Sequence, residues 1–265
     1  MQYAFIGSGN MGRSLARALI GQGVCTPGEI LAIDPSEETL RQMEEFGCQT
    51  AAEADTTLGD VPVVVLAVKP QMAEEVCTRL APLLTPHQVT VSIMAGVTLW
   101  HLQEWLAQKA VVRAMPNTPS QVGLGMNVYL PSEAVDENQL ALVEALLKAS
   151  GEILQVSREE LIDAATAVSG SGPAYVFYFA EQWVHAAQEL GFSSEEATLL
   201  VQQTLVGGTA LWRSTNLAPQ TLRAQVTSKG GTTAAACEHL DKQNVNQAFQ
   251  DAIAKAFERA RELAK

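Results

Sequence analysis

A glycine-rich turn near the N-terminus constrains the fold more than any other part of the chain. It occupies residues 7–12, between an apolar stretch at residues 3–6 and a helical pattern at residues 11–21. In such a G-x-G-x-x-G turn the glycines permit a tight bend, a close approach of the backbone to a pyrophosphate, and close packing of helix on strand. The helix start presents N–H groups to the phosphates. We therefore expect a dinucleotide-binding first domain, with cofactor contacts from Gly7, Ser8, Gly9, Asn10, Met11 and Gly12.

The composition excludes several classes of function. The chain has 265 residues, of which 47% are hydrophobic and 17% are charged, as in a compact folded protein of one large or two modest domains. Its formal net charge of −12 disfavours binding to nucleic acid or to an anionic membrane. An anionic ligand therefore needs local N–H donors.

The expected location is the cytoplasm. The first residues already form a predicted strand, so we expect no signal peptide, and the longest apolar run, residues 61–68, is too short to cross a bilayer. The four cysteines lie far apart without a C-x-x-C pair. This spacing favours buried thiols in a reducing compartment over disulfides or a metal site.

The first part of the chain alternates between strand and helix patterns. Apolar strands that alternate with helices predict a mainly parallel, doubly wound sheet with helices on both faces. After the first strand and helix, the expected strands are residues 29–33, 61–68, 89–93 and 110–115, and the expected helices are residues 36–46, 71–84 and 98–107.

The pattern changes near residue 151, and from about residue 157 it predicts only helices. We expect a dinucleotide-binding domain at 1–155 and an all-α domain at 156–265. The helix expected at 173–190 starts with an apolar run and must be buried on every side. A small helical domain hardly buries it alone, so we expect a homodimer; the alternative is a central helix in a monomeric bundle.

Two segments after the glycine turn are further candidates for cofactor binding. Asp34 follows the second strand, where an acidic side chain accepts hydrogen bonds from an NAD ribose; the alternative is a helix cap. A 2′-phosphate there would need a nearby cation such as Arg41, so NADH and NADPH stay open. At the end of the strand at 61–68, backbone contacts are expected, with Lys69 long enough to reach the cofactor; the alternative is a loop whose Pro70 starts the next helix. The candidates are Asp34, Ser36, Ala67, Val68, Lys69 and Pro70.

Three further segments are candidates for substrate binding. Two prolines flank Asn117 and fix its loop in one orientation; the alternative is a rigid turn with a polar tip. Two glycine-rich helix starts are candidate binding sites for a small carboxylate; the alternative is that these residues only cap the two helices. No strong proton donor stands out in a motif, which favours an activated acceptor such as a protonated cyclic imine. The candidates are Asn117, Ser169, Ser171, Gly172, Gly230, Gly231, Thr232 and Thr233.

Over its whole length the chain resembles the pyrroline-5-carboxylate reductases. The resemblance rests on GSGNMG (7–12), VKPQ (68–71), SIMAGV (92–97), RAMPNTP (113–119), AVSGSGPAYVF (167–177) and VTSKGGTT (226–233). Many dehydrogenases share the first of these segments, whereas the last three in this order are highly specific.

The resemblance implies a Rossmann-like first domain, a helical dimerisation domain, and NAD(P)H-dependent reduction of 1-pyrroline-5-carboxylate to L-proline. It implies an active site between subunits, and decamers of dimers in some members. Thr233 would then be the catalytic residue, with its hydroxyl on the imine nitrogen, while backbone N–H groups around Gly230, Gly231 and Thr232 hold the carboxylate. Two residues depart from the family pattern, since many members carry proline at Lys229 and a neutral residue at Asp34.

Two other classes of protein share part of this pattern. The β-hydroxyacid dehydrogenases share the glycine turn, but they use a lysine after the second glycine motif, and residues 164–197 contain none. A non-catalytic protein on the same scaffold would have lost the glycines or the hydroxyls of residues 232 and 233, and all of these remain.

Overall fold

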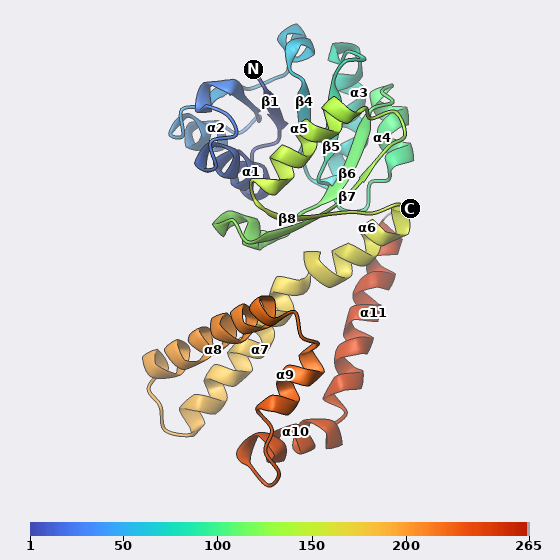
Figure 1. Ribbon diagram of the computed structural model, residues 1–265. Helices are drawn as coiled ribbons and strands as arrows, with labels where there is room; N and C mark the ends of the chain where they lie inside the picture. Colours follow the sequence, from blue (N-terminus) through green and yellow to red (C-terminus); the bar gives the residue numbers. More distant parts are fainter. Residues whose placement is uncertain (264–265) are drawn as a thin grey trace. The chain divides into compact units, whose positions relative to one another are not determined.

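The computed structural model describes residues 1–263 and divides the chain into two compact units (Figure 1). The sheet unit comprises Met1–Pro173 and Ala256–Lys265, of which residues 264 and 265 lie outside the described residues. The helical unit is Ala174–Lys255. These two compact units do not test the predicted domain limits, so the limits 1–155 and 156–265 stay a prediction.

The sheet unit contains one doubly wound sheet of eight strands in the order β3-β2-β1-β4-β5-β6-β7-β8. From β3 to β6 neighbouring strands are parallel, while β7 is antiparallel to β6 and parallel to β8. The strand order reverses between β1 and β4, which is where such sheets bind ligands. The strands are β1 (Tyr3–Ile6), β2 (Ile30–Ile33), β3 (Gln49–Ala51), β4 (Val63–Leu66), β5 (Val89–Ser92), β6 (Val111–Met115), β7 (Gly125–Pro131) and β8 (Gly151–Gln155).

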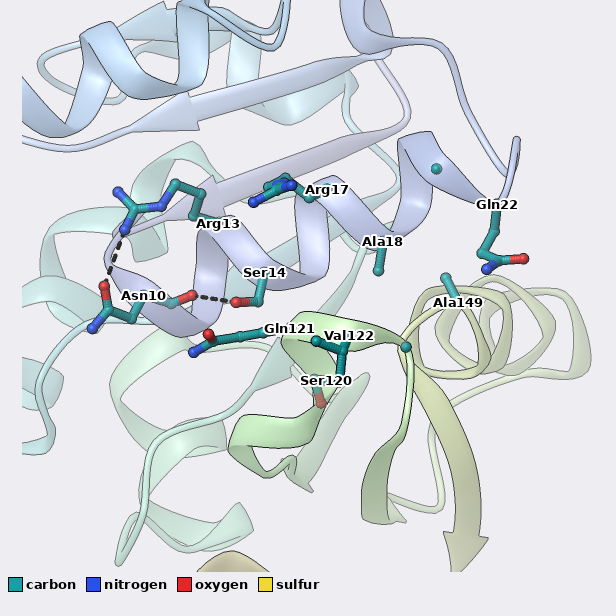
Figure 2. Close-up of a pocket in the computed structure, with 12 residues that line it drawn as sticks. Asn10, Arg13, Ser14, Arg17, Ala18, Gln22, Ser120, Gln121, Val122 and Ala149 are labelled. Atoms are coloured by element: carbon teal, nitrogen blue, oxygen red, sulfur yellow. Dashed lines mark hydrogen bonds between the residues drawn. The ribbon is translucent and has the colours of Figure 1, made fainter. Parts of the chain in front are cut away.

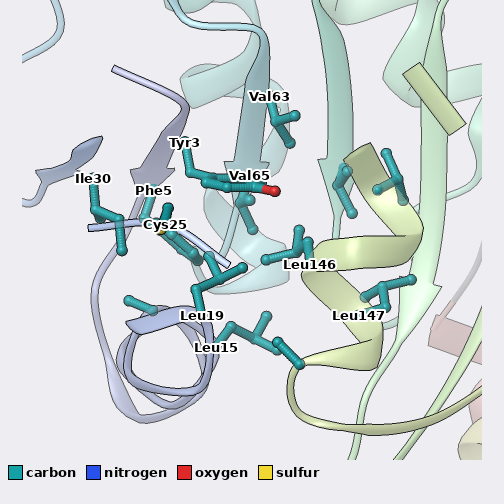
Figure 3. Packing of buried hydrophobic residues seen from close by; sticks show 14 of the residues in the cluster. Tyr3, Phe5, Leu15, Leu19, Cys25, Ile30, Val63, Val65, Leu146 and Leu147 are labelled. Atoms are coloured by element: carbon teal, nitrogen blue, oxygen red, sulfur yellow. The ribbon is translucent and has the colours of Figure 1, made fainter. Parts of the chain in front are cut away.

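Helices cover both faces of this sheet because its central strands are apolar along their whole length. On one face Leu15 of α1 and Leu146 of α5 pack against Phe5 and its neighbours (Figure 3). On the other face Cys77 of α3 and Leu102 of α4 belong to a second buried cluster. The helices are α1 (Asn10–Gly21), α2 (Glu37–Glu44), α3 (Ala73–Leu80), α4 (Leu99–Leu106), α5 (Glu137–Lys148) and α6 (Glu159–Ala165).

Every strand and helix expected from β1 to β6 is present, several of them shorter than predicted, and β3 is an additional strand between them. The run at 61–68 supplies only the four residues of β4, since the chain turns at both ends. The helix expected at 71–84 is α3 with a 3₁₀ turn on each side, and Pro82 lies in the second of these turns. Proline cannot donate the next helical hydrogen bond, so α3 ends before it.

The sequence pattern did not reveal β3, β7, α5 or β8. β3 has three residues, and β8 is a largely exposed edge strand, so neither carries a strong apolar period. β7 and β8 begin as a pair of glycines, Gly125 and Gly151, which face each other in register. A Cβ on Gly151 would lie 2.1 Å from the Gly125 carbonyl oxygen, so a side chain does not fit at this approach.

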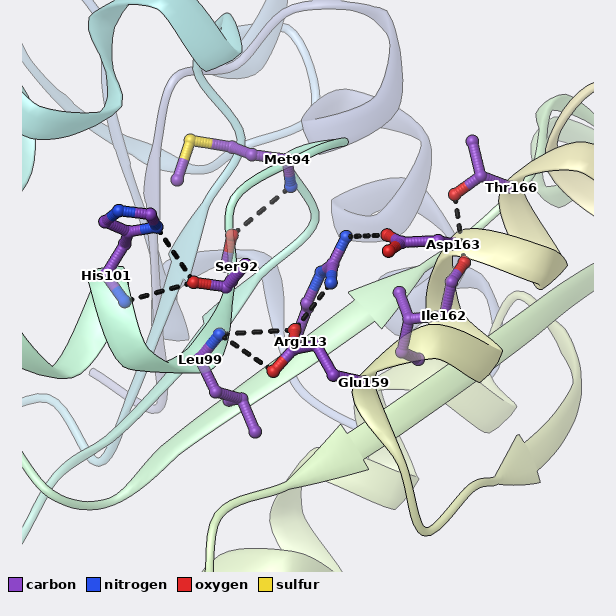
Figure 4. A network of polar contacts seen from close by, with 10 residues as sticks. Ser92, Met94, Leu99, His101, Arg113, Glu159, Ile162, Asp163 and Thr166 are labelled. Carbon is purple, nitrogen blue, oxygen red and sulfur yellow. Dashed lines mark hydrogen bonds and ion pairs between the residues drawn. The ribbon is translucent and has the colours of Figure 1, made fainter. Parts of the chain in front are cut away.

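A buried arginine joins the sheet to α6 (Figure 4). Arg113 of β6 is 1% exposed, and its two terminal nitrogens donate to Glu159 Oε1 at 2.5 Å and Asp163 Oδ1 at 2.7 Å. The Glu159 carboxylate also accepts from the Leu99 N–H at the start of α4. The guanidinium thereby holds three elements together, and removing one partner would leave a buried charge unpaired.

The end of α11 (Val245–Leu263), from Ala256 onward, also belongs to the sheet unit. There it reaches Gly96, in the loop between β5 and α4. Gly96 has φ +75°, and a Cβ on it would lie 2.5 Å from the Leu263 carbonyl oxygen. The glycine therefore permits both the backbone conformation and the close contact with α11.

The helical unit has little apolar core of its own. Within its described residues only Ala187, Ala197 and Val201 are buried hydrophobic side chains. Phe177 on α7 is 68% exposed, and Trp183 is 46% exposed. The helix that was expected to be buried on every side is therefore uncovered in a single chain. Besides most of α7 (Gly172–Glu189) and the start of α11, the unit contains α8 (Ser194–Thr215), α9 (Pro219–Gln225) and α10 (Thr232–Lys242).

The cysteines form no disulfide, and all four lie among the described residues. Cys25, Cys48 and Cys77 are buried, as expected, and Cys237 is partly exposed. Burial raises the pKa of Cys77 to about 12, so its thiol stays protonated and unreactive at neutral pH.

None of the helices in the described part of the chain is long and apolar enough to cross a membrane.

Candidate functional site

Three predicted cofactor segments meet at the carboxyl ends of β1, β2 and β4. The chain leaves β4 beside the glycine turn, where the Ala67 N–H donates to the Ile6 carbonyl at 2.8 Å. A Cβ on Gly7 would lie 2.8 Å from the Ala67 oxygen, and one on Gly12 would lie 2.6 Å from the Gly7 oxygen. Glycine is therefore required at both positions for the turn to pack against β4.

The glycine turn leaves room for a phosphate at its second glycine. Gly9 is the N-cap of α1 and provides no side-chain cap, so the first N–H groups of the helix are open to a ligand. A Cβ on Gly9 would meet nothing within 4 Å. The Ser8 hydroxyl nearby is buried without a hydrogen-bond partner among the described residues. These features fit a bound dinucleotide, whose phosphates would use the N–H groups.

Asp34 ties the glycine turn to the start of α2. One carboxylate oxygen accepts from the Ser8 N–H and the other from the Ser36 N–H, each at 2.9 Å. Ser36 is the helix cap, because its hydroxyl accepts from the Thr39 N–H at 3.3 Å. The alternative interpretation of Asp34 as the cap is therefore wrong. Its carboxylate lies at the end of β2, the place at which an NAD ribose is bound in such sheets.

A polar cavity of about 440 Å³ extends along α1 from Asn10 to Gln22 and borders the 3₁₀ turn Thr118–Val122 (Figure 2). Its two arginines both have partners within the sheet unit. Arg13 donates to Gln42 of α2 and to Asn10 Oδ1, and Arg17 stacks on Phe46 at 5.1 Å. Of the predicted cofactor residues only Asn10 lines it, so the cavity adjoins the predicted site rather than containing it.

Asn117 is held in one orientation, as its flanking prolines suggested. Its Nδ2 donates to the Ser169 carbonyl at 3.0 Å, and its Oδ1 accepts from the Met126 N–H at 2.8 Å. Both ends of the amide therefore have partners within the sheet unit. The predicted contact with substrate remains a prediction, and it would have to use the remaining hydrogen-bonding capacity of this amide.

The glycine-rich segment before α7 is a π-helical turn, Thr166–Gly170. Its wide turn is closed by the Ser171 N–H, which donates to the Thr166 carbonyl at 2.8 Å. The expectation that this segment presents bare N–H groups is therefore wrong at Ser171. Single π-turns within helices occur frequently at functional sites. Ser169, Ser171 and Gly172 are all partly exposed here.

The second glycine-rich segment forms a tight turn before α10. The Gly231 N–H donates to the Ser228 carbonyl at 3.0 Å, and Gly230 has φ +75°. This places Lys229 at the turn position where proline is favoured, so the proline that the resemblance implies at this position would suit the same turn. Gly231 caps α10 without a side-chain hydrogen bond, so the N–H groups of Thr232 and Thr233 have no side-chain cap.

The predicted substrate residues are divided between the two units. Asn117, Ser169, Ser171 and Gly172 lie in the sheet unit, whereas the turn and helix start at 230–233 lie in the helical unit. Sequence reasoning missed the partners of Arg113 and Asn117. Glu159 and Asp163 are four residues apart, so a helical pattern places them on one face, but nothing in the sequence links that face to residue 113.

Known proteins match the chain along its whole length. Residues 159–263 match the family model described as pyrroline-5-carboxylate reductase dimerisation, and residues 2–96 match the model described as NADP oxidoreductase coenzyme F420-dependent. A pyrroline-5-carboxylate reductase of Pseudomonas aeruginosa is 40% identical over 264 residues, which cover 99% of this chain and 96% of that protein. The chain belongs to the pyrroline-5-carboxylate reductase family.

Solved structures of this family agree with the assignment. A pyrroline-5-carboxylate reductase from Coxiella burnetii has a TM-score of 0.92 at 38% identity and covers 100% of this chain and 98% of its own. The Plasmodium falciparum enzyme, solved with NADP bound, has a TM-score of 0.89 at 28% identity with the same coverage. The family assignment decides against the β-hydroxyacid dehydrogenases.

A methyl group added at Gly9 tests whether the glycine turn binds a phosphate of the cofactor. We expect Gly9→Ala to change the free energy of unfolding by less than about 0.5 kcal/mol, because the new Cβ meets nothing in the protein. It should weaken NAD(P)H binding by about tenfold or more, because it occupies space that a phosphate needs. Fluorescence titration and thermal denaturation measure the two effects.

Gly21→Ala at the other end of α1 is the matched control, since its Cβ also meets nothing within 4 Å. It should bind NAD(P)H like the wild type. An unchanged dissociation constant in Gly9→Ala would remove the glycine turn from the cofactor site.

Proposed function

We propose that this chain catalyses the reduction of 1-pyrroline-5-carboxylate to L-proline with NADPH or NADH, the last step of proline biosynthesis. The observation that carries the proposal is the full-length match to pyrroline-5-carboxylate reductases, with 35% identity to the Arabidopsis thaliana protein and 40% to the Pseudomonas aeruginosa protein. The open N–H groups beside Gly9 and at the uncapped start of α10 support it, because the reaction needs a dinucleotide and a small carboxylate, and both can bind to N–H donors.

The residues divide into three roles in this proposal. The glycine turn, Asp34, Ser36 and residues 67–70 hold the cofactor, which supplies the hydride when bound. The start of α10 holds the substrate carboxylate through its backbone N–H groups, and Asn117 and residues 169–172 stay separate candidates for contact with the substrate. The Thr233 hydroxyl hydrogen-bonds the imine nitrogen and orients the C=N bond. None of the side chains assigned to the substrate is a strong proton donor, which suits a substrate whose imine is already protonated.

Removal of the Thr233 hydroxyl tests its role. We expect Thr233→Ala to lower kcat by about one to three orders of magnitude, because the imine loses its orienting hydrogen bond, while NAD(P)H binding stays nearly unchanged. The measurement is NAD(P)H oxidation at 340 nm with 1-pyrroline-5-carboxylate. Thr233→Ser keeps a hydroxyl and should retain most of the activity. Full turnover in Thr233→Ala would exclude the residue from the mechanism, and no turnover in the wild type would refute the proposed function.

The choice between NADH and NADPH is assigned to Asp34. Its carboxylate would repel a 2′-phosphate at the end of β2. We therefore expect Asp34→Ser to raise the ratio of kcat/KM for NADPH to that for NADH by about tenfold, a shift of about 1.4 kcal/mol.

Glu45→Gln is the control for Asp34→Ser. It removes one charge at the exposed C-cap of α2, the end of that helix opposite to Asp34, and it should leave the cofactor ratio unchanged. An unchanged ratio in Asp34→Ser would mean that Asp34 serves only to bind the N–H groups of Ser8 and Ser36.

The assembly proposed for this enzyme is a homodimer formed through the helical unit. The exposed apolar side chains of α7 and α8 support this proposal, since leaving them in water would forfeit about 1.5–3 kcal/mol for each large side chain. The family model over this region is one of dimerisation. We also place the enzyme in the cytoplasm, which the buried free thiols support.

A charge on the exposed face of α7 tests the assembly. We expect Phe177→Lys to lower the molar mass measured by light scattering from that of two or more chains to that of one, because the buried interface would then contain an unpaired charge. A mass near ten chains in the wild type would extend the proposal to a decamer assembled from dimers. Glu75→Lys, exposed on α3, is the control. A wild type that elutes as a monomer would refute the dimer.

A further inference from the structure

Three alternate residues of β6 and the loop after it contact the chain segment that leads into α7. Residues two apart in an extended chain point to the same side. β6 ends at Met115, and Asn117 is still extended, with φ −131° and ψ 168°. The side chains of Arg113, Met115 and Asn117 therefore form one row. Each of them contacts α6 or the π-turn that follows it.

The three contacts are made with α6 and with the π-turn that follows it. Arg113 binds Glu159 and Asp163 of α6, as described above. Met115 lies against Gly170, where a Cβ would be only 2.9 Å from the methionine methyl carbon. The Asn117 amide donates to the Ser169 carbonyl at 3.0 Å.

The hydrogen bond from Asn117 supplies a partner that the helix lacks. In a regular α-helix the Ser169 carbonyl would accept from the N–H of residue 173. Residue 173 is proline, which has no N–H. The carbonyl therefore needs a donor from elsewhere, since a partly buried carbonyl without one costs free energy. The Asn117 side chain provides that donor from a position 52 residues away in the sequence.

We propose that Arg113, Met115 and Asn117 are positioning residues that fix the π-turn Thr166–Gly170 and with it the predicted substrate residues Ser169, Ser171 and Gly172. Asn117 then acts on the reaction through the Ser169 carbonyl and not by contact with the substrate. The relevance to substrate binding depends on the proposed function, whereas the fixing of the π-turn does not.

The experiment uses an isosteric change at Asn117. Asn117→Asp keeps an oxygen that accepts from the Met126 N–H, but it places a second oxygen against the Ser169 carbonyl in place of the donor. Hydrogen exchange of the full-length protein without ligands reports on the π-turn directly. We expect the amide protons of residues 166–172 to exchange about tenfold faster or more, with unchanged exchange in α1 and an unchanged dissociation constant for NAD(P)H. The KM for 1-pyrroline-5-carboxylate should rise.

Two further variants serve as a control and as a rescue. Gln103→Glu removes a similar amide donor to a backbone carbonyl, that of Lys109, elsewhere in the sheet unit, and should leave exchange at 166–172 unchanged. Pro173→Ala restores an N–H at residue 173. Combined with Asn117→Asp, it should return much of the lost protection, because the Ser169 carbonyl regains a donor. Arg113→Ala is less useful, since it leaves two carboxylates without their partner and destabilises the whole unit.

The outcomes separate positioning from direct contact. Faster exchange at 166–172 that Pro173→Ala reverses would support the proposal, even if the wild type proved inactive and the proposed function failed. Unchanged exchange together with a raised KM would overturn it and assign Asn117 to the substrate. Unchanged exchange with unchanged kinetics would overturn it as well.

Discussion

The arrangement of the sheet unit beyond β6 depends on the ion pairs of one buried side chain, that of Arg113. Removing a charge from water is expensive, and this charge is compensated by two carboxylates on one face of α6. Glu159 also accepts from the first N–H of α4, so the same group fixes the helix on the neighbouring connection. Apolar packing of Ile162 and Ala165 against β7 completes the attachment of α6. The π-turn, with the predicted substrate residues Ser169, Ser171 and Gly172, therefore starts from a helix that is anchored to the sheet.

The comparison of sequence and structure separates local from distant causes. The glycine turn, β1, β2, β4 and α1 were predictable because each depends on neighbouring residues, on an apolar run or a G-x-G-x-x-G spacing. β7 and β8 were not, since their pairing depends on two glycines 26 residues apart. α5 was within reach, because Asp136 and Gln139 form a capping box at its start.

The candidate site shows the same division. Sequence spacing identified Asp34 at the end of β2, but it left two interpretations open, and only the contacts with Ser8 and Ser36 decided against the cap. The role of Asn117 depends on Ser169 and Met126, which no pattern within the loop reveals. Pro173 could be recognised as a helix-start residue. Its effect on the Ser169 carbonyl required the π-turn to be known.

The route of the chain has a consequence for how the sheet unit is completed. The helical unit leaves the sheet unit after Pro173, and the chain rejoins the sheet unit at Ala256. The helical unit is therefore an insertion with two covalent attachments, and not a tail on one linker. The sheet unit receives its contact at Gly96 from Leu263, at the end of α11. A nascent chain therefore completes its sheet unit only after the whole insertion has been synthesised.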